Sequence, residues 1–166
     1  MRAGIALGSN LGDRLENLRS GRDAILRLPD VTGPVLSSCV YETEPVDTSL
    51  DADRFLNAVM EVNFSGPPDA LLNGLREIET AQGRPSRHPR NAPRTLDLDI
   101  LYLGALSVSR DDLTLPHPRL HVRRFVLTPL NEICPGLRLP GFTQTIVELL
   151  GGLDDLAAVE LFAREW

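Results

Sequence analysis

The sequence predicts an α+β fold of the ferredoxin-like split βαβ type, with a mainly antiparallel sheet, helices packed on it and a C-terminal extension. Apolar residues alternate with period two in some segments and recur at helical spacing in others, in the order β, α, β, β, α, β. The chain has 166 residues, 42% hydrophobic and 24% charged, which suits one domain with a sizeable core. We therefore expect residues 1–166 to form a single domain.

A strand and a helix open the chain. The first apolar strand ends at Leu7, and the glycine-containing segment 8–12 turns the chain toward Asp13. Asp13 is a good N-cap residue, and Glu16 stands three positions later as its capping-box partner. A helix over residues 14–28 is the result.

Two strand-like segments follow, over residues 35–43 and 55–64. The second is clear, because apolar residues occupy every other position. Its other face carries Phe55 and Asn57, and an aromatic ring beside an amide can stack on a flat heterocycle and bind its polar edge. Ordinary sheet packing with a surface amide is the alternative, and the residues alone favour it.

Further helices and strands are predicted from residue 68 onward. A helix over residues 68–82 begins with proline in its first turn, and Glu79 on this helix would bring a carboxylate toward Phe55 and Asn57. The remaining predicted segments are an irregular loop at 84–94, a strand at 96–103, a hairpin through 104–108, an irregular stretch at 110–119, a helix at 125–133 and a C-terminal helix with Thr143 as N-cap.

Charge and composition exclude several function classes. The net charge is −6, which argues against nucleic-acid or anionic membrane partners. All 17 basic residues are arginine, so mechanisms that need a lysine amine are excluded. Cys39 and Cys134 match no metal or disulfide spacing, and we expect both to be reduced and structural. The sequence lacks a signal segment and an apolar membrane span, so a cytoplasmic location is expected.

Two carboxylates stand two residues apart in the predicted strand 96–103. Residues two apart share a face, so Asp97 and Asp99 project side by side. Their repulsion would be relieved by Mg²⁺, which takes one or two carboxylates and completes its shell with water and phosphate oxygens. A solvated acidic edge strand is the alternative, about equally weighted when the pair is taken alone.

Basic residues flank this acidic pair. Arginine forks bind phosphate in bidentate fashion, and an arginine-rich loop beside a metal-binding pair suits phosphoryl transfer. The loop's arginines are Arg84, Arg87, Arg90 and Arg94. Downstream, His117 stands between two prolines in a rigid segment and can offer a ring nitrogen to a nucleotide. A solvated basic loop and a loop histidine with a structural hydrogen bond are the alternatives.

Six segments together resemble the 6-hydroxymethyl-7,8-dihydropterin pyrophosphokinase family over about residues 4–135. They are ALGSNLGDR at 6–14, YETEPV at 41–46, FLNA at 55–58, PRTLDLDI at 93–100, LPHPR at 115–119 and RRF at 123–125. The resemblance implies an enzyme of folate biosynthesis. It would transfer the terminal pyrophosphate of ATP to the pterin hydroxymethyl oxygen and release AMP, without an obligatory protein partner.

The resemblance also assigns roles to individual residues. Asp97 and Asp99 would hold two Mg²⁺ ions, and Arg84 and Arg94 would act on the transferred group. The implied ATP contacts are Arg84, Arg94, Ile100, Thr114, His117 and Arg123. The implied pterin pocket consists of Thr43, Pro45, Val46, Phe55, Asn57 and Phe125. Glu79 is added to it because of its expected position on the helix over residues 68–82.

Two positions depart from the family pattern. Asn91 stands where many relatives have a tryptophan, so the aromatic lid over the pterin is missing or replaced. Pro118 stands where relatives often have a tyrosine, which changes a contact to the nucleotide. Two other functions compete with the pyrophosphokinase interpretation: an RNA-binding module of the same fold, and a Mg²⁺-dependent nucleotide hydrolase or pseudoenzyme.

Overall fold

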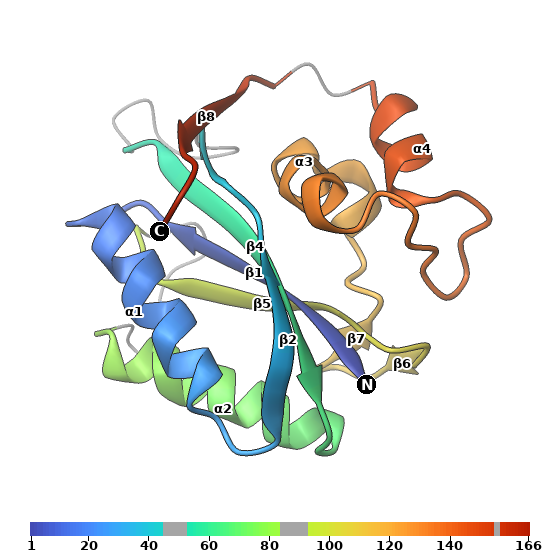
Figure 1. The fold of residues 1–166 in the computed structure, drawn as a ribbon, viewed down its shortest axis with the longest axis horizontal. Coiled ribbons are helices and arrows are strands. Elements are labelled where there is room, and N and C mark those ends of the chain that lie inside the picture. Colours follow the sequence, from blue (N-terminus) through green and yellow to red (C-terminus); the bar gives the residue numbers. More distant parts are fainter. Residues whose placement is uncertain (45–52, 84–92, 155–156) are drawn as a thin grey trace.

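An antiparallel sheet forms the centre of the molecule in a computed structural model that describes residues 1–44, 53–83, 93–154 and 157–166 (Figure 1). Six strands are ordered β5-β1-β4-β3-β8, and β2 also pairs with β4. They are β1 (Arg2–Ser9), β2 (Val31–Ser37), β3 (Val40–Thr43), β4 (Phe55–Phe64), β5 (Asp97–Leu103) and β8 (Val159–Ala163). A separate hairpin joins β6 (Val108–Ser109) to β7 (Thr114–Leu115).

Helices cover both faces of the sheet. The helices are α1 (Arg14–Leu26), α2 (Pro68–Ala81), α3 (Arg124–Ile133), α4 (Ile146–Gly151) and the 3₁₀ helix η1 (Leu120–Val122). The first two bury Leu18, Ile25 and Leu71 in one core cluster, while α3 and α4 contribute to a second cluster. In Figure 1, α1 and α2 lie at the lower left, and α3 and α4 lie at the upper right. The predicted α+β class with an antiparallel sheet and packed helices is confirmed.

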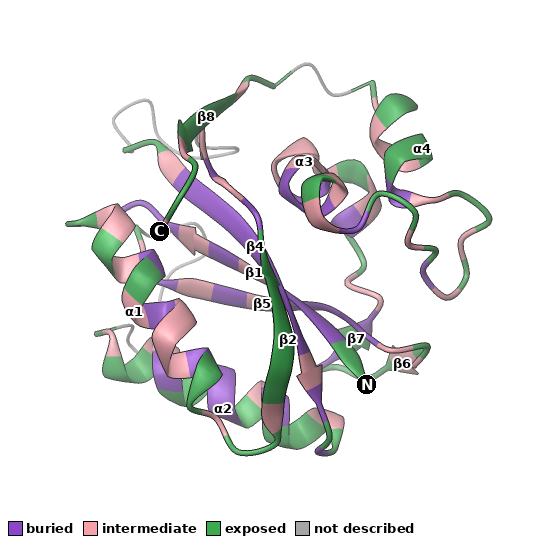
Figure 2. Cartoon of the chain, viewed as in Figure 1, coloured by how far each residue is buried: buried purple, intermediate pink, exposed green. Residues whose placement is uncertain are grey.

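Strand periodicity divides the two core clusters. Even-numbered residues of β4, beginning with Leu56, face α1 and α2, whereas Val59 faces α3. The central strands are largely buried and β2 and β8 are largely exposed (Figure 2). In β5 the pairing to β1 skips Leu101, so Leu101 and Tyr102 both face α3. The Phe55 and Asn57 side of β4 is therefore the α3 side.

Several boundaries differ from the expected ones. Helix α1 ends at Leu26 rather than at residue 28. The strand-like region 35–43 is two strands, because the N–H of Ser38 donates to the carbonyl of Val59 at 2.9 Å and its hydroxyl accepts from the Val59 N–H at 3.0 Å. The predicted N-cap Asp13 is confirmed, since its carboxylate accepts from the Glu16 N–H at 3.1 Å.

The C-terminal part holds the larger corrections. The N-cap of α4 is Thr145 rather than Thr143, because a Glu148 three positions later completes a capping box with it. The hairpin lies at β6 and β7 instead of residues 104–108. Strand β8 was not predicted, and it extends the sheet beside β3. No helix in the described parts of the chain is long and apolar enough to cross a membrane.

Candidate active site

Three strands bring the predicted pterin and metal residues together around one glycine. Gly8 of β1 pairs with Asn57 on β4 and with Asp97 on β5. A Cβ atom at Gly8 would lie 3.6 Å from the Asn57 Oδ1, 3.9 Å from the Asp97 Cβ and 4.0 Å from the Phe55 Cδ1. Gly8 therefore forms a floor between the amide and the aromatic ring on β4 and the carboxylate on β5, two strands that lie two strand spacings, or about 10 Å, apart. The sequence motif around Gly8 was recognised, but this role was not predicted.

The two aspartates form the acidic part of the site. Their side chains are 22% exposed for Asp97 and 45% exposed for Asp99. The pKa of Asp99 is raised, first because surrounding protein displaces water and second because the charge of Asp97 is close. A bound cation would relieve this repulsion.

The donor set at the aspartates fits a hard divalent cation. No group of three or more histidine, cysteine or carboxylate side chains in the described residues could hold a metal ion. A cation at this site would therefore take two ligands from the described residues, the carboxylates of Asp97 and Asp99. Water or phosphate oxygens would complete its coordination shell. Mg²⁺ is commonly bound in this way, with one or two carboxylates plus substrate phosphates.

Arg94 is held beside the acidic pair by an asparagine that sequence reasoning missed. The Arg94 backbone N–H donates to the Asn10 Oδ1 at 2.7 Å, and the Asn10 backbone N–H donates to the Arg94 carbonyl at 3.0 Å. Its guanidinium forms an ion pair with Asp97. Its Nε is buried and has no hydrogen-bond partner among the described residues. An anionic ligand that accepted from this nitrogen would remove the cost of the unpaired donor.

His117 faces the acidic pair from the outer edge of β5. The backbone N–H of His117 donates to the carbonyl of Leu101 at 2.8 Å, and this hydrogen bond holds the segment around His117 against β5. Its Nδ1 accepts from the Arg119 N–H at 3.2 Å, so the neutral ring carries its proton on Nε2, 3.9 Å from an Asp99 carboxylate oxygen. Burial lowers the pKa of His117, which favours the neutral ring. The Nε2–H is therefore a donor directed toward the acidic pair.

Arg123 adds positive charge at the start of α3. It is the N-cap residue of α3, and its guanidinium carbon lies 5.4 Å from the ring centroid of Phe125. Burial and the charge of Arg119 lower its pKa, and the charges of Asp99 and Asp97 oppose this shift. The helix thus brings a guanidinium to the acidic pair and an aromatic ring next to it.

Ile100 and Thr114 lie in different environments. The Ile100 side chain is buried with the core on the α1 and α2 side, so only its backbone is available to a ligand on the opposite side. The N–H of Leu98 points to the outer edge of β5, and backbone groups two residues along an antiparallel strand point the same way. The backbone of Ile100 therefore also faces this edge. Thr114 is exposed on β7.

Glu79 does not lie where it was expected. Its carboxylate accepts from the Leu98 N–H at 2.8 Å, at the outer edge of β5. Strand β1 separates β5 from the strand that carries Phe55 and Asn57. The prediction that Glu79 approaches those two residues is wrong, because α2 packs against β5 at this point and delivers the carboxylate there.

The pterin side of the site is partly described. The Asn57 Nδ2 donates to the Thr43 Oγ1 at 2.8 Å, and both side chains are buried. Phe55 pairs with Thr43 in the ladder between β3 and β4. Phe125 is half-buried on α3, which packs on the same side of the sheet. The predicted residues that lie outside the described residues are Pro45, Val46, Arg84, Arg87, Arg90 and Asn91.

Known proteins match this chain over most of its length. Residues 4–135 match the model of the family described as 7,8-dihydro-6-hydroxymethylpterin-pyrophosphokinase (HPPK). The chain is 44% identical over 130 residues to a 2-amino-4-hydroxy-6-hydroxymethyldihydropteridine pyrophosphokinase of Bacillus subtilis, covering 78% of this chain and 76% of the relative. It is 40% identical over 157 residues to the Haemophilus influenzae protein of the same name, covering 95% and 96%.

Longer proteins also match. The chain is 44% identical over 131 residues to a folate synthesis bifunctional protein of Arabidopsis thaliana, covering 78% of this chain but only 26% of that relative. A crystal structure of Plasmodium falciparum HPPK-DHPS wild type with pteroate matches with a TM-score of 0.68 and 16% identity, covering 90% of this chain and 42% of that one. At this identity the structural match supports the fold alone.

Proposed function

The chain belongs to the 7,8-dihydro-6-hydroxymethylpterin-pyrophosphokinase family, and we propose that the site around Gly8 carries out the reaction of that family. This reaction transfers pyrophosphate from ATP to 6-hydroxymethyl-7,8-dihydropterin in folate synthesis, and the enzyme is a pyrophosphokinase. The observation that carries the assignment is the meeting of Asn57, Phe55 and Asp97 around one glycine. A site for a heterocycle and a site for metal-bound phosphate must adjoin in this way.

Asp97 and Asp99 are the proposed metal ligands, for two Mg²⁺ ions. The raised pKa of Asp99 and the adjacent charge of Asp97 support this role, because a divalent cation stabilises both ionised carboxylates. Bound Mg²⁺ would neutralise charge on the phosphate oxygens. The carboxylates would fix the position of the cation relative to Gly8, and phosphate oxygens would complete its shell.

Five side chains and one backbone segment are proposed to bind the nucleotide. Arg94 and Arg84 stabilise charge on the transferred and leaving phosphates, and the buried unpaired Nε of Arg94 supports its part. His117 donates its Nε2–H to a phosphate or ribose oxygen. Further contacts come from Thr114, Arg123 and the backbone of Ile100.

The pterin is proposed to bind on the other side of Gly8. Because one Nδ2–H of Asn57 donates to Thr43, the amide is held in orientation, and its Oδ1 can accept from an N–H on the polar edge of the heterocycle. Phe55 and Phe125 stack on its two faces. Pro45 and Val46 complete the pocket.

Positioning and charge neutralisation are the proposed sources of catalysis. The pterin hydroxymethyl oxygen attacks the β-phosphorus in line, the bond from this phosphorus to the oxygen of the α-phosphate breaks, and AMP leaves with that oxygen. The alcohol proton passes to solvent. No covalent enzyme intermediate forms; His117 holds the phosphate chain in the attacking geometry, and Arg94 stabilises the charge that develops in the transition state.

We also propose the ferredoxin-like split βαβ topology for the first part of the chain. The antiparallel order β5-β1-β4-β3, with α1 following β1 and α2 following β4, supports it. Both helices cover the same face of this sheet.

Chromatography of the nucleotide products tests the function. The protein is incubated with Mg-ATP, with and without 6-hydroxymethyl-7,8-dihydropterin. AMP formed only in the presence of the pterin is the expected result. ADP, or hydrolysis without the pterin, would instead support the nucleotide hydrolase, and oligonucleotide binding without turnover would support the RNA-binding module.

A further inference from the structure

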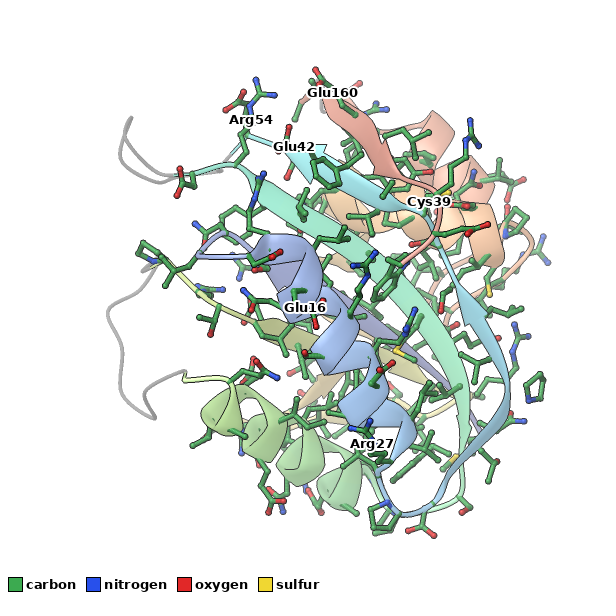
Figure 3. All side chains as sticks on the ribbon, turned by 60° about the vertical axis from the view of Figure 1, so that its left-hand side comes forward. Glu16, Arg27, Cys39, Glu42, Arg54 and Glu160 are labelled. Atoms are coloured by element: carbon green, nitrogen blue, oxygen red, sulfur yellow. The ribbon has the colours of Figure 1, made fainter. Side chains whose placement is uncertain are left out.

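A cluster of charged side chains lies at one end of the sheet, next to the pterin side of the site. It consists of Arg14 at the start of α1, Glu42 in β3, Arg54 immediately before β4 and Glu160 in β8, and we name it the Arg54 cluster. Figure 3 shows Arg54, Glu42 and Glu160 close together at this end of the sheet. Three elements and the residue that precedes β4 therefore meet in one group of ion pairs.

Two arginines join the strands on either side of residues 45–52. The Arg14 Nη1 donates to the Glu42 Oε1 at 2.8 Å and to the backbone carbonyl of Arg54 at 2.7 Å. The Arg54 Nη1 lies 3.5 Å from the Glu42 Oε2 and 3.8 Å from the Glu160 Oε2. Arg54 also forms an ion pair with Glu44. The end of β3 and the start of β4 are thus held by the same charged groups.

Arg54 offsets a repulsion that the pairing of β3 and β8 creates. Glu42 and Glu160 are directly opposite each other in this antiparallel pair, and like charges in such positions destabilise a sheet. The Arg54 Nη1 lies within 4 Å of both carboxylates. Removal of Arg54 would therefore take away the guanidinium that lies near both carboxylates, and Glu160 would face a Glu42 that keeps its ion pair with Arg14.

The Arg54 cluster is adjacent to two proposed pterin contacts. Glu42 directly precedes Thr43, and Arg54 directly precedes Phe55. Thr43 and Phe55 form the last pair of the ladder between β3 and β4. Because successive strand residues point to opposite faces, Glu42 points away from the face on which Thr43 accepts from Asn57. The Arg54 cluster therefore contacts the backbone next to the proposed pterin pocket, with Glu42 on the opposite face of the sheet.

We propose that Arg54 is a positioning residue for the pterin, acting with Arg14 and Glu42 to hold Thr43 and Phe55 in the binding geometry. This inference rests on the function proposed above. The aspartates lie on β5, which is separated from β4 by β1. A loss of the Arg54 cluster therefore shifts the pterin contacts and leaves the nucleotide contacts in place.

Steady-state kinetics of Arg54→Ala test this role. We expect the KM for 6-hydroxymethyl-7,8-dihydropterin to rise by about tenfold, because small displacements of substrate-positioning groups have large effects, while the KM for ATP changes by less than about twofold. Arg54→Lys should give an intermediate value, since lysine keeps the charge without the planar fork. Arg19→Ala is the matched control, because Arg19 is 45% exposed against 46% for Arg54 and forms its ion pair with Glu16, outside the Arg54 cluster.

A second variant tests the repulsion itself. Arg54→Ala combined with Glu160→Gln removes one of the two facing carboxylates, so the pterin KM should return toward the wild-type value. Calorimetric titration with the pterin in the presence of a non-hydrolysable ATP analogue gives a readout independent of turnover, and the affinities should follow the same order.

Three results would overturn the proposal: equal rises in both KM values for Arg54→Ala, a lower melting temperature with an unchanged pterin KM, or no recovery in the double variant. Failure of the wild-type protein to form AMP with the pterin would instead refute the proposed function. The two ideas are therefore tested separately.

Discussion

Gly8 and Gly4 on β1 provide a matched pair of substitutions that separates the site from the core. They are four residues apart, so both face α3. A Cβ at Gly8 meets its neighbours at 3.6 Å or more, which is ordinary contact, whereas a Cβ at Gly4 would lie 2.2 Å from the Tyr102 ring. Gly8→Ala should therefore fold, and Gly4→Ala should not fit without rearrangement.

The magnitudes follow from these distances. Alanine in place of a strand glycine stabilises by about 0.5–1 kcal/mol where the space allows, so Gly8→Ala should keep or slightly raise the melting temperature. Overpacking at Gly4 should cost about 1–3 kcal/mol, or ~2–12 °C for a chain of this size. The new methyl at Gly8 projects between Asn57 and Asp97, and a displacement of about 1 Å there should lower kcat/KM about a hundredfold.

Thermal denaturation and the AMP-forming assay, applied to both variants, measure these effects. The expected pattern is a stable, nearly inactive Gly8→Ala protein and a destabilised Gly4→Ala protein. A Gly8→Ala protein with wild-type kcat/KM would refute the role of Gly8 as the floor of the site. A destabilised Gly8→Ala protein would refute the packing argument.

Three further outcomes are expected. Asp99→Asn should fold with unchanged or higher stability, because repulsion with Asp97 is removed, and should lose about a hundredfold or more in pyrophosphate transfer together with the stabilisation by Mg-ATP in a thermal-shift assay. Arg94→Ala should lower kcat by about a hundredfold and change ATP affinity much less, as separated by single-turnover kinetics and equilibrium binding; a loss confined to binding would contradict a transition-state role. Burial and Glu132 raise the pKa of Tyr41 to about 12, and that of Tyr102 is also raised, so ultraviolet titration should show no tyrosinate near pH 10 in the folded protein. The unfolded chain ionises near pH ~10, so stability in urea should fall as pH rises between about 10 and 12, and a normal tyrosinate titration would contradict the assigned burial.

Local signals predicted the elements whose residues act through short-range rules. Alternation gave the bounds of β4 at residues 55 and 64, and proline in the first turn placed the start of α2 at residue 68. The same rules placed Asp97 and Asp99 on one side of a strand. They could not reveal β8, because its five residues are partly exposed and are stabilised as a strand by long-range pairing with β3.

Relations between distant residues were the least predictable part of the site. Asn10 holds Arg94 through two hydrogen bonds across 84 positions, and nothing in either local sequence specifies this pairing. Glu79 was assigned to the wrong strand because the helical pattern predicts which face of α2 is buried, but not which strand it contacts. The position of Gly8 between Asn57 and Asp97 likewise required the strand order.

Because the pairing with β1 skips Leu101, we expect the effects of mutations to differ on the two sides of this residue along β5. Before Leu101, positions alternate between the buried core and the catalytic side, so a deep mutational scan should show abundance-sensitive Leu98 and Ile100 between activity-sensitive Asp97 and Asp99. After it, Tyr102 lies in the second core cluster and Leu103 in the first, and both positions should affect abundance alone. Leu101, which the pairing with β1 skips, thus marks the point along β5 after which we expect mutations to affect folding and no longer to affect catalysis.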